Sequence, residues 1–243
     1  MKTLPLLSLV FLTSACGPTV VWYGRSPDRC KQAKVIETKN KQYLSLDQKR
    51  GQYYDGIAIE GLVFSPDSKH LAYPARQDQR WAVVADGIRS PFWDGIGQVM
   101  FSPNSTELVY VAQRGSLWYV VRGADDGPGY EELLADSLRF SPDGKRLAFA
   151  IQRGKFVHVV IDGEAQPAND AIGKLSFSPD SGRLTYPARR GESTHLIVGD
   201  WISPPHEAIA EFAFNPQDER VAYLARQDQR WFEIGRASCR ERV

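Results

Sequence analysis

The sequence has few of the side chains that build metal sites and disulfide frameworks. Its 243 residues include three cysteines and four histidines. Cys16, Cys30 and Cys239 stand far apart in the chain and show no metal-ligand spacing. A disulfide scaffold and a zinc-type site are therefore excluded as the basis of the fold. One pairing stays open, that of Cys16 with Cys30 in an oxidising compartment.

An excess of charge of either sign is also missing. Thirty basic and twenty-nine acidic residues give a formal net charge of +1. This balance does not favour nucleic acid or an anionic membrane surface as a partner, so neither is predicted. With 42% hydrophobic and 24% charged residues, the composition is that of a globular protein.

The N-terminal hydrophobic run is too short to remain in a bilayer. Leu4–Leu12 follows a lysine and precedes small residues, which is the layout of a secretory signal. The stretch LTSAC resembles a bacterial lipobox, which implies a signal peptide over residues 1–16 and lipidation of Cys16. Thr13 departs from the aliphatic residue preferred there, so ordinary signal cleavage stays open. Gly17, in place of Asp, implies a periplasmic protein anchored in the outer membrane.

The two ends of the mature chain are predicted to lie outside the fold. Residues 17–40 are polar and are expected to form a leader or linker. The run EIGRASCRERV, residues 233–243, breaks the patterns before it, and from Ile234 onward it back-translates into a sequence resembling a short-read sequencing adapter. If this run is foreign, it plays no part in the fold, and Phe232 is roughly the last genuine residue. The natural protein is then predicted to be longer.

A repeat fills the region between these ends. Aligned phenylalanines recur at spacings of 37, 39, 37 and 37 residues, each with proline two places later: Phe64, Phe101, Phe140, Phe177 and Phe214. Large apolar residues stand seven and nine places after each phenylalanine, and this period of two predicts strands. Self-similarity at a fixed period of this length indicates a repeat architecture.

Each repeat contains the signals of four short strands. A first strand leads into a Pro-Asp turn, a second strand, a polar hairpin tip, a third strand that is apolar on both faces, and a short outer strand. The turns can be closed by side-chain to backbone hydrogen bonds from Asp67, Asn104, Asp143 and Asp180. Four strands in ~40 residues form a blade of a β-propeller. The predicted fold class is therefore all-β, a β-propeller over residues 41–232 with four complete blades and partial blades at both ends.

The first partial blade is predicted to lack its inner strands. Lys41–Ile57 matches only the second half of a repeat, since QYYDGI echoes SPFWDGI. Propellers close by letting strands from one terminus complete the blade begun by the other. We therefore expect this segment to complete the half-blade at Phe214–Phe232, which gives five blades here, with six to eight in the natural protein.

The repeats resemble a known family. FSPDSKHLAY, FSPDGKRLAF and FSPDSGRLTY are similar to the WD40-like (PD40) repeat of bacterial periplasmic propellers, the type found in the TolB propeller and in the propeller domains of prolyl oligopeptidase-like peptidases. The resemblance covers nearly all of the predicted mature chain. It implies the fold strongly and a function only weakly, because propellers serve many functions.

Signals of catalysis are poor. The sequence has no G-x-S-x-G elbow and no glycine-rich phosphate loop, and its histidines, His70, His158, His195 and His206, are taken to stand at unrelated positions of the repeat. One aspartate per turn does not supply the closely spaced oxygen ligands that calcium needs, which favours turn closure. No cofactor, metal or catalytic residue is predicted.

A repeated basic position is the strongest candidate for binding. Arginines follow each phenylalanine by twelve or thirteen places, at the tip between the second and third strands: Arg76, Arg114, Arg153, Arg189, Arg190 and Arg226. The loops entering the next blade share that face and carry Tyr54, Asp55, Trp93, Asp94 and Tyr130. Arginines beside aromatic residues suit carboxylate-bearing or peptide ligands. The alternative is that these arginines only solvate the tips and pair with nearby acids.

Two functional classes stay open. The favoured one is a non-catalytic binding or scaffold propeller, tethered by lipid, that holds a protein or peptide partner through this face. The alternative is the gating propeller of a prolyl oligopeptidase-like serine hydrolase whose catalytic domain lies beyond the predicted truncation. A downstream G-x-S-x-G followed by Asp and His would favour the hydrolase.

Overall fold

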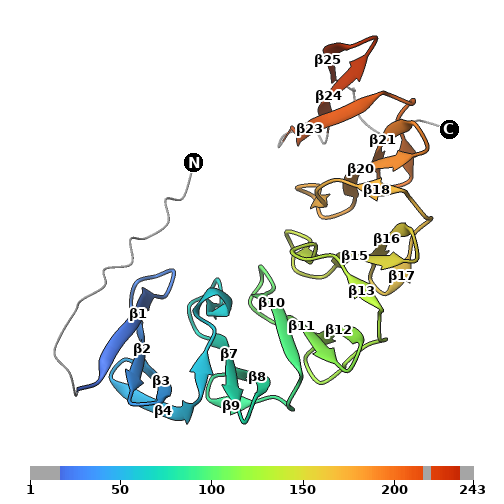
Figure 1. Ribbon diagram of the computed structural model, residues 1–243. Coiled ribbons are helices and arrows are strands. Elements are labelled where there is room, and N and C mark those ends of the chain that lie inside the picture. The colour runs from blue at the N-terminus through green and yellow to red at the C-terminus, as the bar shows by residue number, and fades with distance from the viewer. Residues whose placement is uncertain (1–16, 216–219, 236–243) are drawn as a thin grey trace. The chain divides into compact units, whose positions relative to one another are not determined.

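The computed structural model describes residues 17–215 and 220–235, and it divides the chain into two compact units, Met1–Gly129 and Tyr130–Val243. Each unit contains three antiparallel sheets, which we number 1 to 6 in chain order (Figure 1). Among the described residues, no helix has the length and apolar character needed to cross a bilayer.

The first unit contains sheets 1 to 3. Sheet 1 consists of β1 (Thr19–Arg25), β2 (Gln32–Thr38), β3 (Lys41–Leu46) and β4 (Lys49–Tyr54). Sheet 2 has a split inner strand, β5 (Gly56–Ile57) and β6 (Val63–Phe64) around the 3-10 turn Ile59–Gly61, followed by β7 (Leu71–Gln77), β8 (Arg80–Ala85) and β9 (Ile88–Arg89). Sheet 3 consists of β10 (Gly95–Phe101), β11 (Leu108–Arg114) and β12 (Leu117–Arg122). In sheet 3 an isolated bridge between Arg122 and Asp125 takes the place of an outer strand.

The second unit contains sheets 4 to 6. Sheet 4 consists of β13 (Glu132–Leu133), β14 (Arg139–Phe140), β15 (Leu147–Arg153), β16 (Phe156–Ile161) and β17 (Glu164–Ala165). Sheet 5 consists of β18 (Ala171–Ile172), β19 (Ser176–Phe177), β20 (Leu184–Arg190), β21 (Ser193–Val198) and β22 (Trp201–Ile202). Sheet 6 consists of β23 (Ala208–Phe214), β24 (Val221–Gln227) and β25 (Arg230–Gly235). The predicted fold class, all-β with four-stranded propeller blades, is confirmed.

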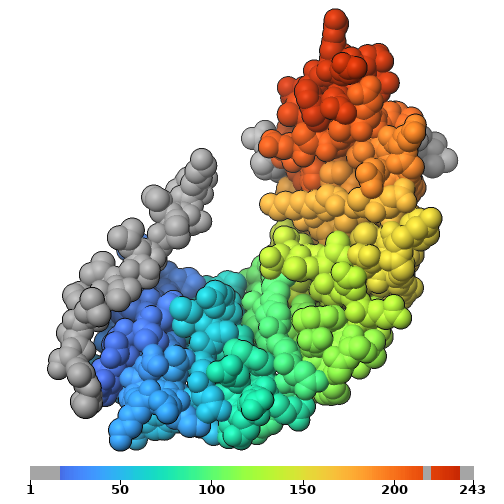
Figure 2. All heavy atoms as spheres, viewed as in Figure 1, coloured from blue at the N-terminus to red at the C-terminus, as the bar shows by residue number. Residues whose placement is uncertain are grey.

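Neighbouring sheets within a unit pack face to face through strands that are apolar on both sides. In β7, Leu71, Tyr73 and Ala75 pack with residues of sheet 1, whereas Ala72 packs with sheet 3. The same kind of packing joins sheet 4 to sheet 5 and sheet 5 to sheet 6. Figure 2 shows the atoms of successive sheets in continuous contact within each unit. The central strands are therefore covered on both faces, as their apolar sequence predicts.

The Pro-Asp turns are closed as predicted. In sheet 2 the Ser65 hydroxyl donates to Asp67 Oδ1 at 2.6 Å, and the same oxygen accepts the Lys69 N–H at 3.1 Å. The Asp67 N–H donates to Ser105 Oγ of the next turn, at 3.0 Å. The turns of sheets 1, 2 and 4 therefore connect their own two strands and also bond to the neighbouring sheet.

The prediction of a polar leader over residues 17–40 is wrong. β1 and β2 occupy most of this segment and pair with β3, so that Lys41–Leu46 is the third strand of a complete sheet. Ser26-Pro27-Asp28 forms the same closed turn as the later repeats, and the Asp28 N–H donates to Ser68 Oγ at 3.0 Å. The first blade is therefore complete, and the hypothesis that Lys41–Ile57 completes the C-terminal half-blade is wrong.

The predicted foreign tail begins inside a strand. Glu233, Ile234 and Gly235 continue β25 and pair with β24. The rest of that run, with Cys239, and the predicted signal peptide, with Cys16, lie outside the described residues. The origin of the tail and the lipidation of Cys16 stay predictions.

Candidate binding face

The six predicted arginines occupy two registers, not one. Arg76, Arg189 and Arg226 stand twelve places after their phenylalanines, whereas Arg114, Arg153 and Arg190 stand thirteen places after theirs. Because successive side chains of a strand point to opposite faces, the two sets face opposite sides of their sheets. We call the first set the forward arginines, because in sheets 2 and 5 they stand on the face that packs on the following sheet and in sheet 6 on the corresponding face, and the second set the backward arginines.

Two of the backward arginines, Arg114 and Arg190, contact residues of the chain segment that leads into their own sheet. The Arg114 guanidinium lies 4.0 Å from the centre of the Trp93 ring. In sheet 5, Arg190 Nε donates to Asn169 Oδ1 at 2.8 Å. These two side chains cap packed residues, so their first role is structural.

The predicted aromatic residues of the face are buried. Tyr54 is 1% exposed, Trp93 0% and Tyr130 8%. Tyr54 packs edge-on against Tyr73 at 6.4 Å, and Tyr130 packs in the same way against Phe149 at 5.5 Å. Burial raises the pKa of both Tyr54 and Tyr130. The prediction that these three side chains contact a ligand directly is wrong, because the interior of each unit covers them.

The predicted acids hold the hairpin tips in place. Asp55 accepts the Asp78 N–H at 2.7 Å, and Asp94 accepts the Gly115 N–H at 2.7 Å. Asp55 also accepts a hydrogen bond from the Lys41 ammonium, and this bond, followed by the Asp78 N–H, lowers the pKa of Asp55. Asp170 accepts a tip N–H in the same way in sheet 5. These carboxylates therefore fix the geometry of the tips on which the arginines stand.

The forward arginines are exposed. Arg76 lies 5.8 Å from the ring of its cross-strand neighbour Trp81, and Arg226 lies 6.0 Å from Trp231. Arg226 also pairs with Glu207 at 3.1 Å. Within the described residues, the side chain of Arg189 has no ion pair or hydrogen bond. Arg114 and Arg153 are exposed as well, so accessible guanidinium groups stand at the tips in both registers, and two of them, those of Arg76 and Arg226, lie beside tryptophan.

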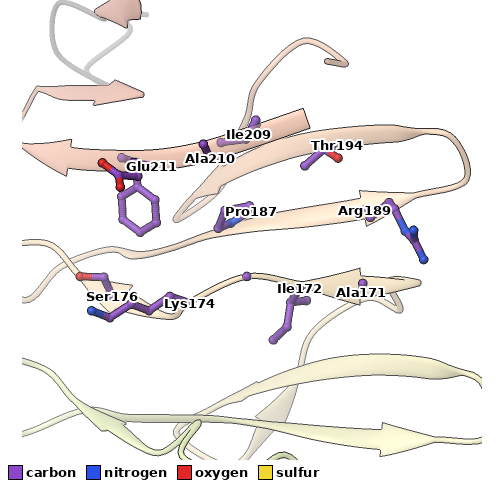
Figure 3. A pocket seen from close by; sticks show the side chains of 12 residues that line it. Ala171, Ile172, Lys174, Ser176, Pro187, Arg189, Thr194, Ile209, Ala210 and Glu211 are labelled. Carbon is purple, nitrogen blue, oxygen red and sulfur yellow. The ribbon is translucent and has the colours of Figure 1, made fainter. Parts of the chain in front are cut away.

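Arg189 lines a cavity between sheets 5 and 6, which we call the inner-strand pocket. Its volume is about 510 Å³. Figure 3 shows Arg189 and Thr194 at one end, Lys174, Ser176 and Glu211 toward the other, and Pro187 between them. The sequence locates Arg189 but does not predict this pocket, because the rest of the lining comes mainly from the irregular inner strands over residues 171–176 and 209–212.

Two of the histidines share a repeat position that the sequence comparison misses. His158 and His195 both stand eighteen places after their phenylalanines, and the Nδ1 atom of each lies 2.9 Å from a carbonyl oxygen, that of Gln166 and that of Ser203 respectively. Burial, followed by the nearby His195, lowers the pKa of His206. Both shared contacts are made to the chain segment beyond the outer strand, which gives these histidines a structural role.

Comparisons with known proteins identify similar folds. No family model and no curated protein matches the chain. Among solved structures, TolB from Acinetobacter baumannii is 16% identical with a TM-score of 0.42, over 77% of this chain and 52% of TolB. The β-propeller domain of the Trilobed protease from Pyrococcus furiosus is 15% identical with a TM-score of 0.41, over 88% of this chain and 78% of that domain. This chain thus spans about half the length of TolB, and the likeness concerns the fold alone.

Proposed function

We propose that the protein is a non-catalytic binding module that holds a protein or peptide partner through the face formed by its hairpin tips. The observation that carries this proposal is the set of exposed forward arginines, Arg76, Arg189 and Arg226, at one register of three sheets. Guanidinium groups beside tryptophan suit carboxylates and peptide surfaces, through bidentate hydrogen bonds and stacking. The tip-capping aspartates support the proposal, because they hold the arginines on rigid turns.

The proposal includes a location. The signal-like N-terminus with Cys16 at its end supports export, and it supports membrane attachment on the periplasmic side through a lipid anchor on Cys16 alone.

Charge reversal tests the proposed face. The triple variant Arg76→Glu, Arg189→Glu and Arg226→Glu is immobilised and its capture of proteins from a periplasmic extract is compared with that of the wild type. We expect at least a tenfold loss of each captured partner. The matched control reverses Arg29, Lys69 and Lys145, which are exposed in the turns at the opposite ends of the strands.

The control separates a specific face from a general charge effect. Capture that is unchanged in the first triple variant, or lost equally in both, would contradict the assignment of the face. Cleavage of a captured peptide by the purified protein would contradict its non-catalytic character.

A further inference from the structure

The inner-strand pocket forms where the inner strands of two neighbouring sheets both depart from regular pairing, in sheet 5 by a break and in sheet 6 by a register shift. In sheet 5, residues 173–175 separate β18 from β19, and a Cβ added to Gly173 would lie 3.0 Å from the Pro187 ring. In sheet 6, the register of β23 against β24 shifts between Ile209 and Phe212, so that Ala210 and Glu211 have no Cα partner in β24. Bulges of this kind re-aim side chains and are common next to functional sites.

The charged groups of the pocket have no partners among the residues that the structure describes. Arg189, Lys174 and Glu211 line it, and none of their side chains makes an ion pair or hydrogen bond within the described residues. The two arginines nearest to it in the repeat differ in this respect, since Arg226 pairs with Glu207 and Arg190 bonds to Asn169, although Arg76 in sheet 2 is as free as Arg189 within the described residues. The free guanidinium of Arg189 is therefore available to an anionic group, with the Thr194 hydroxyl as a second donor.

The middle of the pocket is apolar and short. Ile172, Pro187 and Ile209 lie there (Figure 3), and Phe212 also belongs to the lining of the pocket. The wall formed by residues 209–212 is about 10 Å long at ~3.3 Å per residue, which accommodates about three extended residues. The Glu211 carboxylate at the far end, beside the Lys174 ammonium, supplies an acceptor for a ligand that presents N–H groups there.

We propose that the inner-strand pocket binds the carboxyl terminus of a peptide with apolar final residues. The terminal carboxylate bonds to Arg189 and Thr194, the last side chain packs on Pro187 and Ile209, and a backbone N–H upstream donates to Glu211. This inference rests on the proposed function, because it names the part of a peptide partner that one forward arginine recognises. The volume of the inner-strand pocket, about 510 Å³, lies within the usual range of ligand pockets, roughly 300–1,000 Å³.

Peptides that differ only at their terminus test the inference. The probe is a fluorescein-labelled pool of tetrapeptides that end in leucine, isoleucine, valine or phenylalanine, in free-acid and carboxamide forms. Fluorescence anisotropy is expected to give the free acids at least tenfold tighter binding than the amides. Arg189→Gln should remove this difference by weakening the free acids to the level of the amides, whereas Lys145→Gln, exposed in the Pro-Asp turn of sheet 4 and outside the proposed face, should behave as the wild type.

Two further measurements locate the site and identify the ligand class. The free-acid pool should shift the amide NMR signals of Thr194, Ala210 and Glu211. Equal binding of acid and amide, or a difference that survives Arg189→Gln, would overturn the inference. Displacement of the pool by 4-methylpentanoate at equal potency would overturn the peptide assignment in favour of a simple carboxylate.

The result is separable from the test of the proposed function. If the pool fails to bind while reversal of the three forward arginines still abolishes partner capture, the pocket inference fails and the proposed function stands. If neither assay depends on these arginines, both fail.

Discussion

At the scale of single residues, the aspartate of a Pro-Asp turn accepts hydrogen bonds from the turn, and these bonds stabilise its ionised carboxylate. The Ser65 hydroxyl and then the Lys69 N–H lower the pKa of Asp67 to about 2. An unperturbed aspartate has a pKa of about 3.9. Because the folded-state pKa is depressed, Asp67 contributes stability that is present above pH ~3.9 and is lost as the pH falls toward 2.

Asp67→Asn is expected to weaken this pH dependence. The amide oxygen keeps the turn closed, as Asn104 does in sheet 3, where its Oδ1 accepts from Ser102 Oγ at 2.6 Å. Urea denaturation between pH 5 and pH 2 should therefore give a shallower fall in the free energy of unfolding than in the wild type. Asn104→Asp is the reciprocal variant and should steepen the fall. Parallel curves for all three proteins would contradict the role given to the turn.

At the scale of elements, the repeat predicts the strands well but not their irregularities. The period of two and the Pro-Asp turns predict the four-stranded blades, which the structure confirms. The first blade is missed because Arg25 stands where later repeats have phenylalanine, although Ser26-Pro27-Asp28 was a usable signal. The inner-strand pocket could not be predicted, because the bulge at Ala210 and Glu211 depends on packing between sheets and not on local propensity.

The candidate face was also predicted only in part from the sequence. Sequence spacing locates the arginines at the tips. Because arginines twelve and thirteen places after the phenylalanine were treated as one position, the prediction missed that Arg76 and Arg114 face opposite sides of their sheets. Aromatic residues in loops also have no period that reports burial, so Trp93 looked accessible. Strand alternation, applied residue by residue from Leu71 or Leu108, would have separated the two sets of arginines.

Trp93→Ala is expected to disrupt the packing between sheets 2 and 3. The side chain is fully buried in the cluster that contains Val83, Val99 and Tyr110. Replacement of a buried tryptophan by alanine costs about 3–5 kcal/mol in the free energy of unfolding. Trp231→Ala is the control, because Trp231 is 51% exposed, and it should cost less than about 1 kcal/mol. A stable Trp93→Ala variant with reduced partner capture would instead make Trp93 a binding residue.

At the scale of the whole molecule, the proposed anchor and the proposed binding face make separate demands on the chain. The face requires only the described sheets, whereas the anchor requires Cys16. Cys16→Ser is therefore expected to abolish incorporation of radiolabelled palmitate and to move the exported protein from the membrane fraction to the soluble fraction. Binding of partner by the purified variant should stay at the wild-type level, because no forward arginine is altered.

Cys30→Ser provides the matched control for lipidation. Cys30 is exposed and lies in the first Pro-Asp turn, where its N–H donates to Asp28 Oδ1 at 2.9 Å. A serine keeps that backbone bond, so both labelling and fractionation should match those of the wild type. Loss of label in Cys30→Ser, or its retention in Cys16→Ser, would show that the lipobox resemblance is misleading. Export without label in both the wild type and Cys16→Ser would favour ordinary signal cleavage, and the binding face would then act in a soluble periplasmic protein.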